Sequence, residues 1–199
     1  MHLRPTEIED LEYANCAGPA QEWEQTHKTP AESLDQALGL LQQYLKEAID
    51  LCRVDQLVGA VELMLAYLDW VTGDAKDCGV FIDNPVLYPR QLLLWNKLNI
   101  CFLAICQRQK DITEATLKAN APLSPGCLSI SQIETLVNEL ICLSDRIEDD
   151  GLVDYEMGFW EEEILSILDQ CLSLSNTINS NQLQNASSTA AYLVAQRLW

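Results

Sequence analysis

The stretch Pro89–Cys106 (PRQLLLWNKLNICFLAIC) decides the fold. From Leu92 onward, only Asn96, Lys97 and Asn99 interrupt its apolar residues. A helix at a protein surface has one apolar stripe, whereas a helix that is apolar nearly all round is buried. The leading proline suits the first helical position, because its missing N–H has no intrahelical partner there. The stretch therefore predicts a central helix enclosed by other helices. It is too short for a bilayer, which takes about 20 apolar residues.

Helical patterns flank this stretch on both sides. Thr29, Pro30 and Glu32 form a capping-box start for a helix to about Cys52, with apolar residues spaced three and four apart. Further helices are expected from an Asp55 cap to Val71, from Asp111 to Asn120, from Ser131, and from Phe159 to Leu174. We therefore expect an all-α, single-domain bundle of about six to seven helices around 89–106.

Composition divides the chain into three parts. Residues 1–28 form a polar, acidic N-terminal arm, in which Thr6–Asn15 is a possible short helix with four apolar residues. Residues 29–175 form the helical bundle. Residues 176–199 are expected to be a polar linker, because 176–188 carries no charge, followed by a short helix from Thr189 to Trp199.

The net charge is −18, with 30 acidic residues against 12 lysines and arginines. Binding to a nucleic-acid backbone needs clustered cations, and anionic membranes repel such a chain, so we expect no direct nucleic-acid or membrane partner. A basic protein partner fits better, although solubility alone also accounts for the charge. The eight cysteines include no CxxC pair and mostly fall on apolar helix faces. Reduced thiols of this kind indicate a cytoplasmic or nuclear location.

The acidic zone 145–163 offers the strongest candidate for chemistry. Asp149, Asp150 and Asp154 form the pattern DDGLVD, and paired carboxylates can hold Mg²⁺ together with a phosphorylated substrate. The six residues resemble the aspartate-rich motif of class I terpene cyclases and prenyl synthases, all-α enzymes. The resemblance implies a magnesium-dependent enzyme acting on a prenyl-type substrate, with these three aspartates as ligands. The other interpretation is a solvated acidic loop without any cofactor.

Polar residues within the apolar stretch permit a second site. Asn96 and Asn99, beside Trp95, either bond a neighbouring helix or line a small-molecule pocket between helices. A nucleophilic triad is not supported, because the two histidines, His2 and His27, both lie in the N-terminal arm.

The leading hypothesis is a non-enzymatic protein–protein interaction module, such as an adaptor or a regulatory subunit. Aromatic residues dominate binding hot spots, and we expect the contact residues to lie in the acidic N-terminal arm and in the acidic zone 145–163. They are Trp23, Tyr155, Trp160, Glu161 and Glu162. The apolar stripe Leu34–Cys52 also permits a homo-oligomer. Finally, Cys52, Asp55, Leu57 and Trp70 resemble the helical regulatory part of fungal zinc-cluster regulators, although the cysteine cluster of their DNA-binding part is missing.

Overall fold

The computed structural model describes residues 29–73, 79–149 and 158–197, with side chains described as far as residue 147 in the second range and residue 184 in the third. These residues form helices and contain no β-strand, which confirms the all-α class. The five described helices are α1 (Pro30–Arg53), α2 (Leu57–Thr72), α3 (Tyr88–Ala119), α4 (Ile130–Asp149) and α5 (Glu161–Arg197).

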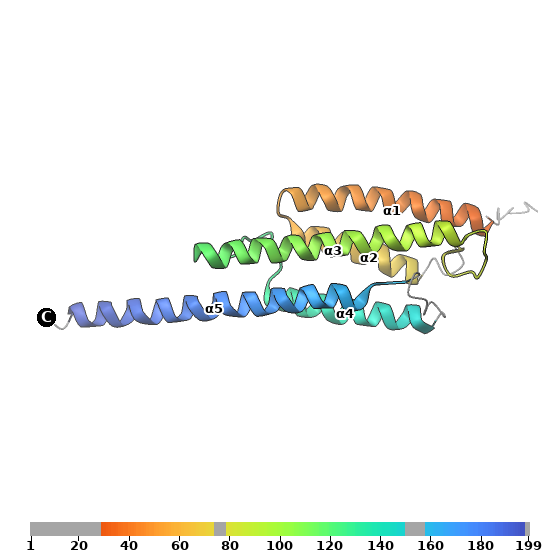
Figure 1. Ribbon diagram of the computed structural model, residues 1–199. Coiled ribbons are helices and arrows are strands. Elements are labelled where there is room, and N and C mark those ends of the chain that lie inside the picture. Colours follow the sequence, from red (N-terminus) through yellow and green to blue (C-terminus); the bar gives the residue numbers. More distant parts are fainter. Residues whose placement is uncertain (1–28, 74–78, 150–157, 198–199) are drawn as a thin grey trace, which may run out of the picture.

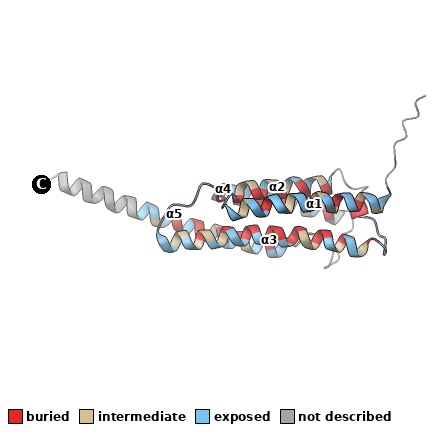
Figure 2. Cartoon of the chain, turned by 90° about the horizontal axis from the view of Figure 1, so that it is seen from above, coloured by how far each residue is buried: buried red, intermediate tan, exposed pale blue. Residues whose placement is uncertain are grey.

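The helices lie in two layers (Figure 1). The first layer holds α1, α3 and α5, which run in the same direction, with α3 in contact with both of its neighbours. The second holds α2 and α4, which run in the opposite direction and contact each other. Between the layers, α2 packs on α1 and α3, whereas α4 packs on α5. The buried residues, red in Figure 2, form one core to which all five described helices contribute.

The first two helices begin in different ways. The capping box of α1 is present as predicted: the backbone N–H of Thr29 donates to Glu32 Oε2 at 2.8 Å, and that of Glu32 donates to Thr29 Oγ1 at 3.3 Å. The prediction that Asp55 caps α2 is wrong. The N–H groups of Leu57 and Val58 donate instead to the carbonyl oxygen of Gly126, at 2.8 and 3.2 Å. Because that carbonyl already satisfies the helix start, the Asp55 carboxylate is left to pair with Arg108, which lies 2.7 Å away.

The predicted enclosure of 89–106 is not confirmed. The helix α3 contacts α1, α2 and α5, but its outer face carries exposed Leu93, Ile100 and Ala104. The stretch is apolar on nearly all sides, yet it lies in an outer layer, so one side has no covering helix among the described residues.

Two expected breaks between helices are wrong, which leaves five described helices instead of six or seven. Residues 107–110 stay within α3, because the buried side chain of Gln109 is hydrogen-bonded to residues 113 and 128. The supposed linker 176–188 lies inside α5. There the hydroxyls of Thr177 and Ser180 each donate to the carbonyl oxygen four residues earlier, at 2.9 Å, and are thereby satisfied inside the helix.

The described helices include none that combines the length and the apolar character needed to cross a membrane.

Candidate functional site

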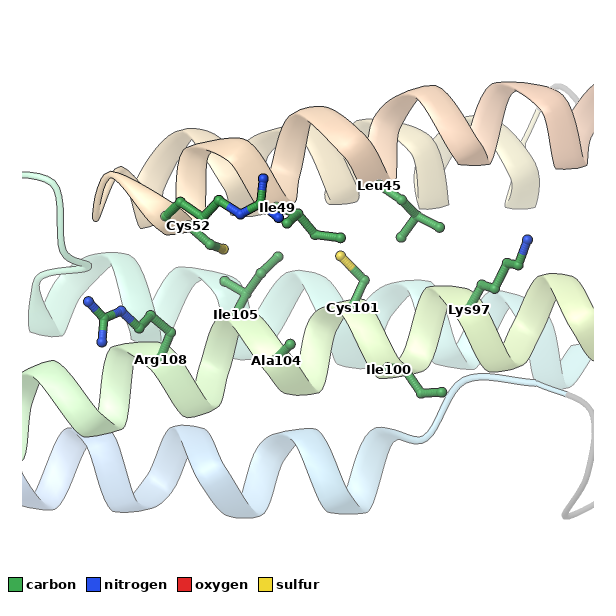
Figure 3. A pocket seen from close by; sticks show the side chains of 10 residues that line it. Leu45, Ile49, Cys52, Lys97, Ile100, Cys101, Ala104, Ile105 and Arg108 are labelled. Carbon is green, nitrogen blue, oxygen red and sulfur yellow. The ribbon is translucent and has the colours of Figure 1, made fainter.

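A groove of about 570 Å³ runs along the surface between α1 and α3 (Figure 3). Seven of its ten lining residues are apolar or thiol side chains, and the other three are cations. The lining residues of α1 are Leu45, Ile49, Cys52 and Arg53, and those of α3 are Lys97, Ile100, Cys101, Ala104, Ile105 and Arg108. Among the described residues, no carboxylate lines the groove, in a protein whose acidic residues outnumber its cations by more than two to one.

The residues on each wall of the groove follow helical spacing, and the groove is open because no described element packs between the two walls. Residues 45, 49 and 52 lie four and three apart on α1, and residues 97, 101, 104 and 108 follow the same spacing on α3. Each set is the kind of stripe that a helix presents to a neighbouring helix. The two stripes flank the space between α1 and α3, and no described element fills it. Ile49 is 46% exposed and Ile100 is 58% exposed as a result.

The cations lie at the two ends of the groove. Lys97 is at one end and forms no ion pair with any described residue, whereas Arg108 is at the other, near Cys52 (Figure 3). Arg53 directly follows Cys52 on α1 and therefore belongs to the Arg108 end. Arg53 pairs with Asp50 at 2.9 Å and Arg108 with Asp55 at 2.7 Å, but all four side chains remain at least two-fifths exposed. Exposed pairs of this kind contribute about 0–1 kcal/mol. The arginines can therefore exchange these partners for the carboxylates of a bound molecule at little cost.

Two thiols point into the groove, Cys52 from α1 and Cys101 from α3 (Figure 3). Burial raises the pKa of Cys101 to about 12, and it also raises the pKa of Cys52 above its usual value. Elsewhere in the core, burial raises the pKa of Cys171 to about 11. A reactive cysteine has a lowered pKa, because the thiolate is the nucleophile. These cysteines therefore act as apolar packing groups.

The predicted pocket residues Trp95, Asn96 and Asn99 lie outside the groove. Asn99 is fully buried and connects α3 to the start of α5: its Nδ2 donates to the Gly158 carbonyl at 2.8 Å, and its Oδ1 accepts from the Trp160 N–H at 3.0 Å. The ring of Trp95 is fully buried and meets Phe81 edge-on, with 6.2 Å between centroids. Asn96 is half-buried. Asn99 and Trp95 thus stabilise the bundle, and none of the three lines the groove.

The predicted contact residues in the acidic zone are only partly described. Trp160 and Glu161 are half-buried and Glu162 is exposed, with both glutamates in the first turn of α5. Carboxylates there interact favourably with the helix dipole. Trp23 and Tyr155 lie outside the described residues, so these two predictions remain predictions.

The predicted magnesium ligands also fall where the structure gives no side chains. Asp150 and Asp154 lie outside the described residues, and the side chain of Asp149 is not described. Over the described part of the chain, no three His, Cys, Asp or Glu side chains gather in a way that could hold a metal ion.

The groove was not predicted from the sequence. Its signal was present, because Leu45 and Cys52 lie on the recognised stripe of α1 and Lys97–Arg108 repeats the same spacing on α3.

No protein-family model matches the chain, and no significant match exists among curated proteins or solved structures.

Proposed function

We propose that the protein is a non-enzymatic protein–protein interaction module, an adaptor or regulatory subunit, whose α1–α3 groove binds an amphipathic helix of a partner protein. The apolar groove between two helical stripes supports the proposal, because an exposed apolar patch with polar ends is typical of an interaction site.

The shape of the groove favours a helix. The stretch from Lys97 to Arg108 covers about 17 Å of α3, which is about three helical turns. A helix of that length places apolar side chains at i, i+3 or i+4, and i+7, and these residues enter a groove between two helices. Ile49 and Ile100, one from each wall, are the side chains that such a helix would bury first.

The ends of the groove favour acidic flanks on the bound helix. Arg53 and Arg108 at one end and Lys97 at the other attract carboxylates. A second copy of this chain fits less well. If two grooves met antiparallel, Lys97 would face the arginines of the other copy, and if they met parallel, each cation would face its own counterpart. Like charges lie opposite each other in both cases, which destabilises the contact.

A designed peptide tests the proposal. The probe is a fluorescein-labelled peptide of about 14 residues with leucines at i, i+4 and i+7 and glutamates on both flanks. We expect saturable binding by fluorescence anisotropy, and Ile100→Asp should weaken it about tenfold or more, because a carboxylate would enter the apolar contact. Val86→Asp is the matched control, since Val86 is 81% exposed and lies outside the groove.

Two results would overturn the proposal. One is equal binding by the wild type and Ile100→Asp. The other is equal binding of a peptide in which lysines replace the glutamates, because that would remove the role of Lys97, Arg53 and Arg108.

A further inference from the structure

We infer that the protein's own segment Thr6–Asn15 occupies the α1–α3 groove and must leave before a partner helix enters. This inference rests on the groove of the proposed function and adds its regulation. Three observations support it: the chemistry of the segment, its reach and the order of its charges.

The segment has acidic flanks and two of the three apolar positions that the groove requires; the third position, seven residues after Ile8, is Asn15. Its sequence is TEIEDLEYAN, and Thr6 and Glu9 have the spacing of a capping box. On the predicted helix, Ile8 and Leu11 lie three residues apart and therefore share a face. Carboxylates flank that face on both sides, at positions 7, 9, 10 and 12. Ten helical residues cover about 15 Å, close to the length of the groove.

The connection to α1 is long enough. The first residue of α1 that lines the groove is Leu45, which lies about 22 Å along the helix from Pro30. Residues 16–29 span up to about 46 Å when extended, so they can return along α1 to that point. The shortest path makes the segment antiparallel to α1, with Asn15 near Lys97 and Thr6 near Arg53 and Arg108.

The charges agree with that direction. The first turn of the segment, with Glu7, Glu9 and Asp10, meets the two arginines, whereas Glu12 meets Lys97. The opposite direction would place three of the four carboxylates at the single lysine and leave only one for the two arginines. The linker and the charges therefore select the same orientation.

The thiol of Cys52 gives a direct measurement of occupancy on the full-length, reduced protein. Cys52 is half-buried in the groove, and exposed Cys142 on α4 lies outside it, so Cys142 serves as an internal reference. Both are followed by a pulse of N-ethylmaleimide and peptide mass mapping. We expect Ile8→Asp/Leu11→Asp to speed modification of Cys52 about fivefold or more and to leave Cys142 unchanged. An unchanged rate at Cys52 would overturn the inference.

A charge exchange tests the orientation. Lys97→Glu alone should speed modification of Cys52 about twofold or more, because it places like charges together. The combination of Lys97→Glu with Glu12→Lys should return the rate to that of the wild type. A combination that reacts as fast as Lys97→Glu would overturn the proposed direction.

The glutamate-flanked peptide separates this inference from the proposed function. The arm variant Ile8→Asp/Leu11→Asp is titrated with the peptide while modification of Cys52 is followed. If the variant does not expose Cys52 but the peptide protects it, the inference fails and the proposed function stands. If the variant exposes Cys52 and the peptide gives no protection, the arm occupies the groove and the proposed function fails. A rate constant for modification of Cys52 that falls as protein concentration rises would show that a second copy covers the groove, and would overturn the inference.

Discussion

Three amide side chains on α3, Gln91, Asn99 and Gln109, each connect a loop to this helix, and all three are almost fully buried. Gln91 Nε2 donates to the carbonyls of Gly79 and Ile82, at 2.7 and 2.9 Å. Gln109 exchanges two hydrogen bonds with the backbone of Leu128, at 2.8 and 3.2 Å. A buried amide is stable only when its donors and acceptors are matched, so each loop is held in a defined position.

The first prediction concerns Asn99. Its replacement by alanine would leave the Gly158 carbonyl and the Trp160 N–H without their partner, and each unsatisfied buried group costs about 1–3 kcal/mol. We expect Asn99→Ala to lower the free energy of unfolding by about 2–4 kcal/mol in urea titrations. Asn96→Ala, at a half-buried position on the same helix, should change it by less than about 0.5 kcal/mol. Equal effects of the two substitutions would contradict this role for Asn99.

The second prediction concerns pH. Thiols ionise near pH 9.0 in the unfolded chain, whereas burial raises the pKa of Cys101 to about 12 and that of Cys171 to about 11 in the folded protein. Above pH 9.0 the unfolded state therefore binds fewer protons, and the free energy of unfolding falls as pH rises. We expect the melting temperature to decline from about pH 8 to about pH 10.5, and to decline less steeply in Cys101→Ala/Cys171→Ala. Parallel curves for the two proteins would show that these thiols do not contribute.

At the scale of the element, the start of α2 depends on a residue almost seventy positions away in the sequence, Gly126. Its carbonyl accepts the first N–H groups of α2, and a Cβ at this position would overlap the Asp55 carbonyl oxygen. A side chain therefore forces the loop and the helix apart. Asp55 itself adopts a left-handed backbone conformation, with φ of 57°, so it has little freedom to adjust.

The third prediction compares two glycines. Gly126→Ala should destabilise the protein by about 2 kcal/mol or more, because it separates the carbonyl from the start of α2. Gly39→Ala is the control within α1, where a Cβ would meet no atom within 4 Å. Alanine is the better helix former there, and we expect a gain of about 0.5–1 kcal/mol. Thermal unfolding measures both changes, and a neutral Gly126→Ala would contradict the structural role of the loop.

The beginnings of helices were more predictable than their ends. The capping box at Thr29 and Glu32 is a local signal, and its predicted hydrogen bonds are present. The continuation of α3 through 107–110 was missed because it involves a contact with a distant residue. That of α5 through 176–188 was missed because the polar side chains there, such as Thr177 and Ser180, bond carbonyls four residues earlier inside the helix. Gln109 belongs to α3 because its side chain is hydrogen-bonded to Leu128. The spacing of polar residues along the sequence does not predict that hydrogen bond. Tertiary packing overrode local preference at 107–110.

For the whole molecule, the sequence contained the class of fold but not its layering. An apolar helix surrounded by amphipathic helices predicts a bundle, and α3 does carry the most extensive set of buried side chains. Its place in an outer layer follows from how five helices pair, which the apolar pattern of a single helix does not determine. The same layering creates the groove, so the site was missed for the same reason that the enclosure of α3 was wrong.

The last prediction concerns α5, whose 37 residues cover about 56 Å and run beyond the end of the bundle (Figure 1). Its described buried residues are Ile164, Leu168, Cys171, Ser175 and Ile178, and positions 182–184 are exposed. Most of the stability of a helix in a protein comes from packing, and asparagine, serine and threonine are poor helix formers.

We therefore expect amide hydrogen exchange to divide this helix. Backbone amides of 165–178 should exchange slowly, with the rate of global unfolding, whereas those of 182–197 should exchange at least about a hundredfold faster. Mass spectrometry of overlapping peptides measures the exchange rates of both segments. The matched substitutions Leu168→Ala and Leu183→Ala extend the test, because only Leu168→Ala removes a buried side chain. Equal protection along α5 in dilute protein would contradict this account. Protection of 182–197 that rises with protein concentration would instead show that another chain covers the extension, in which case the end of α5 is a second interaction surface beside the groove.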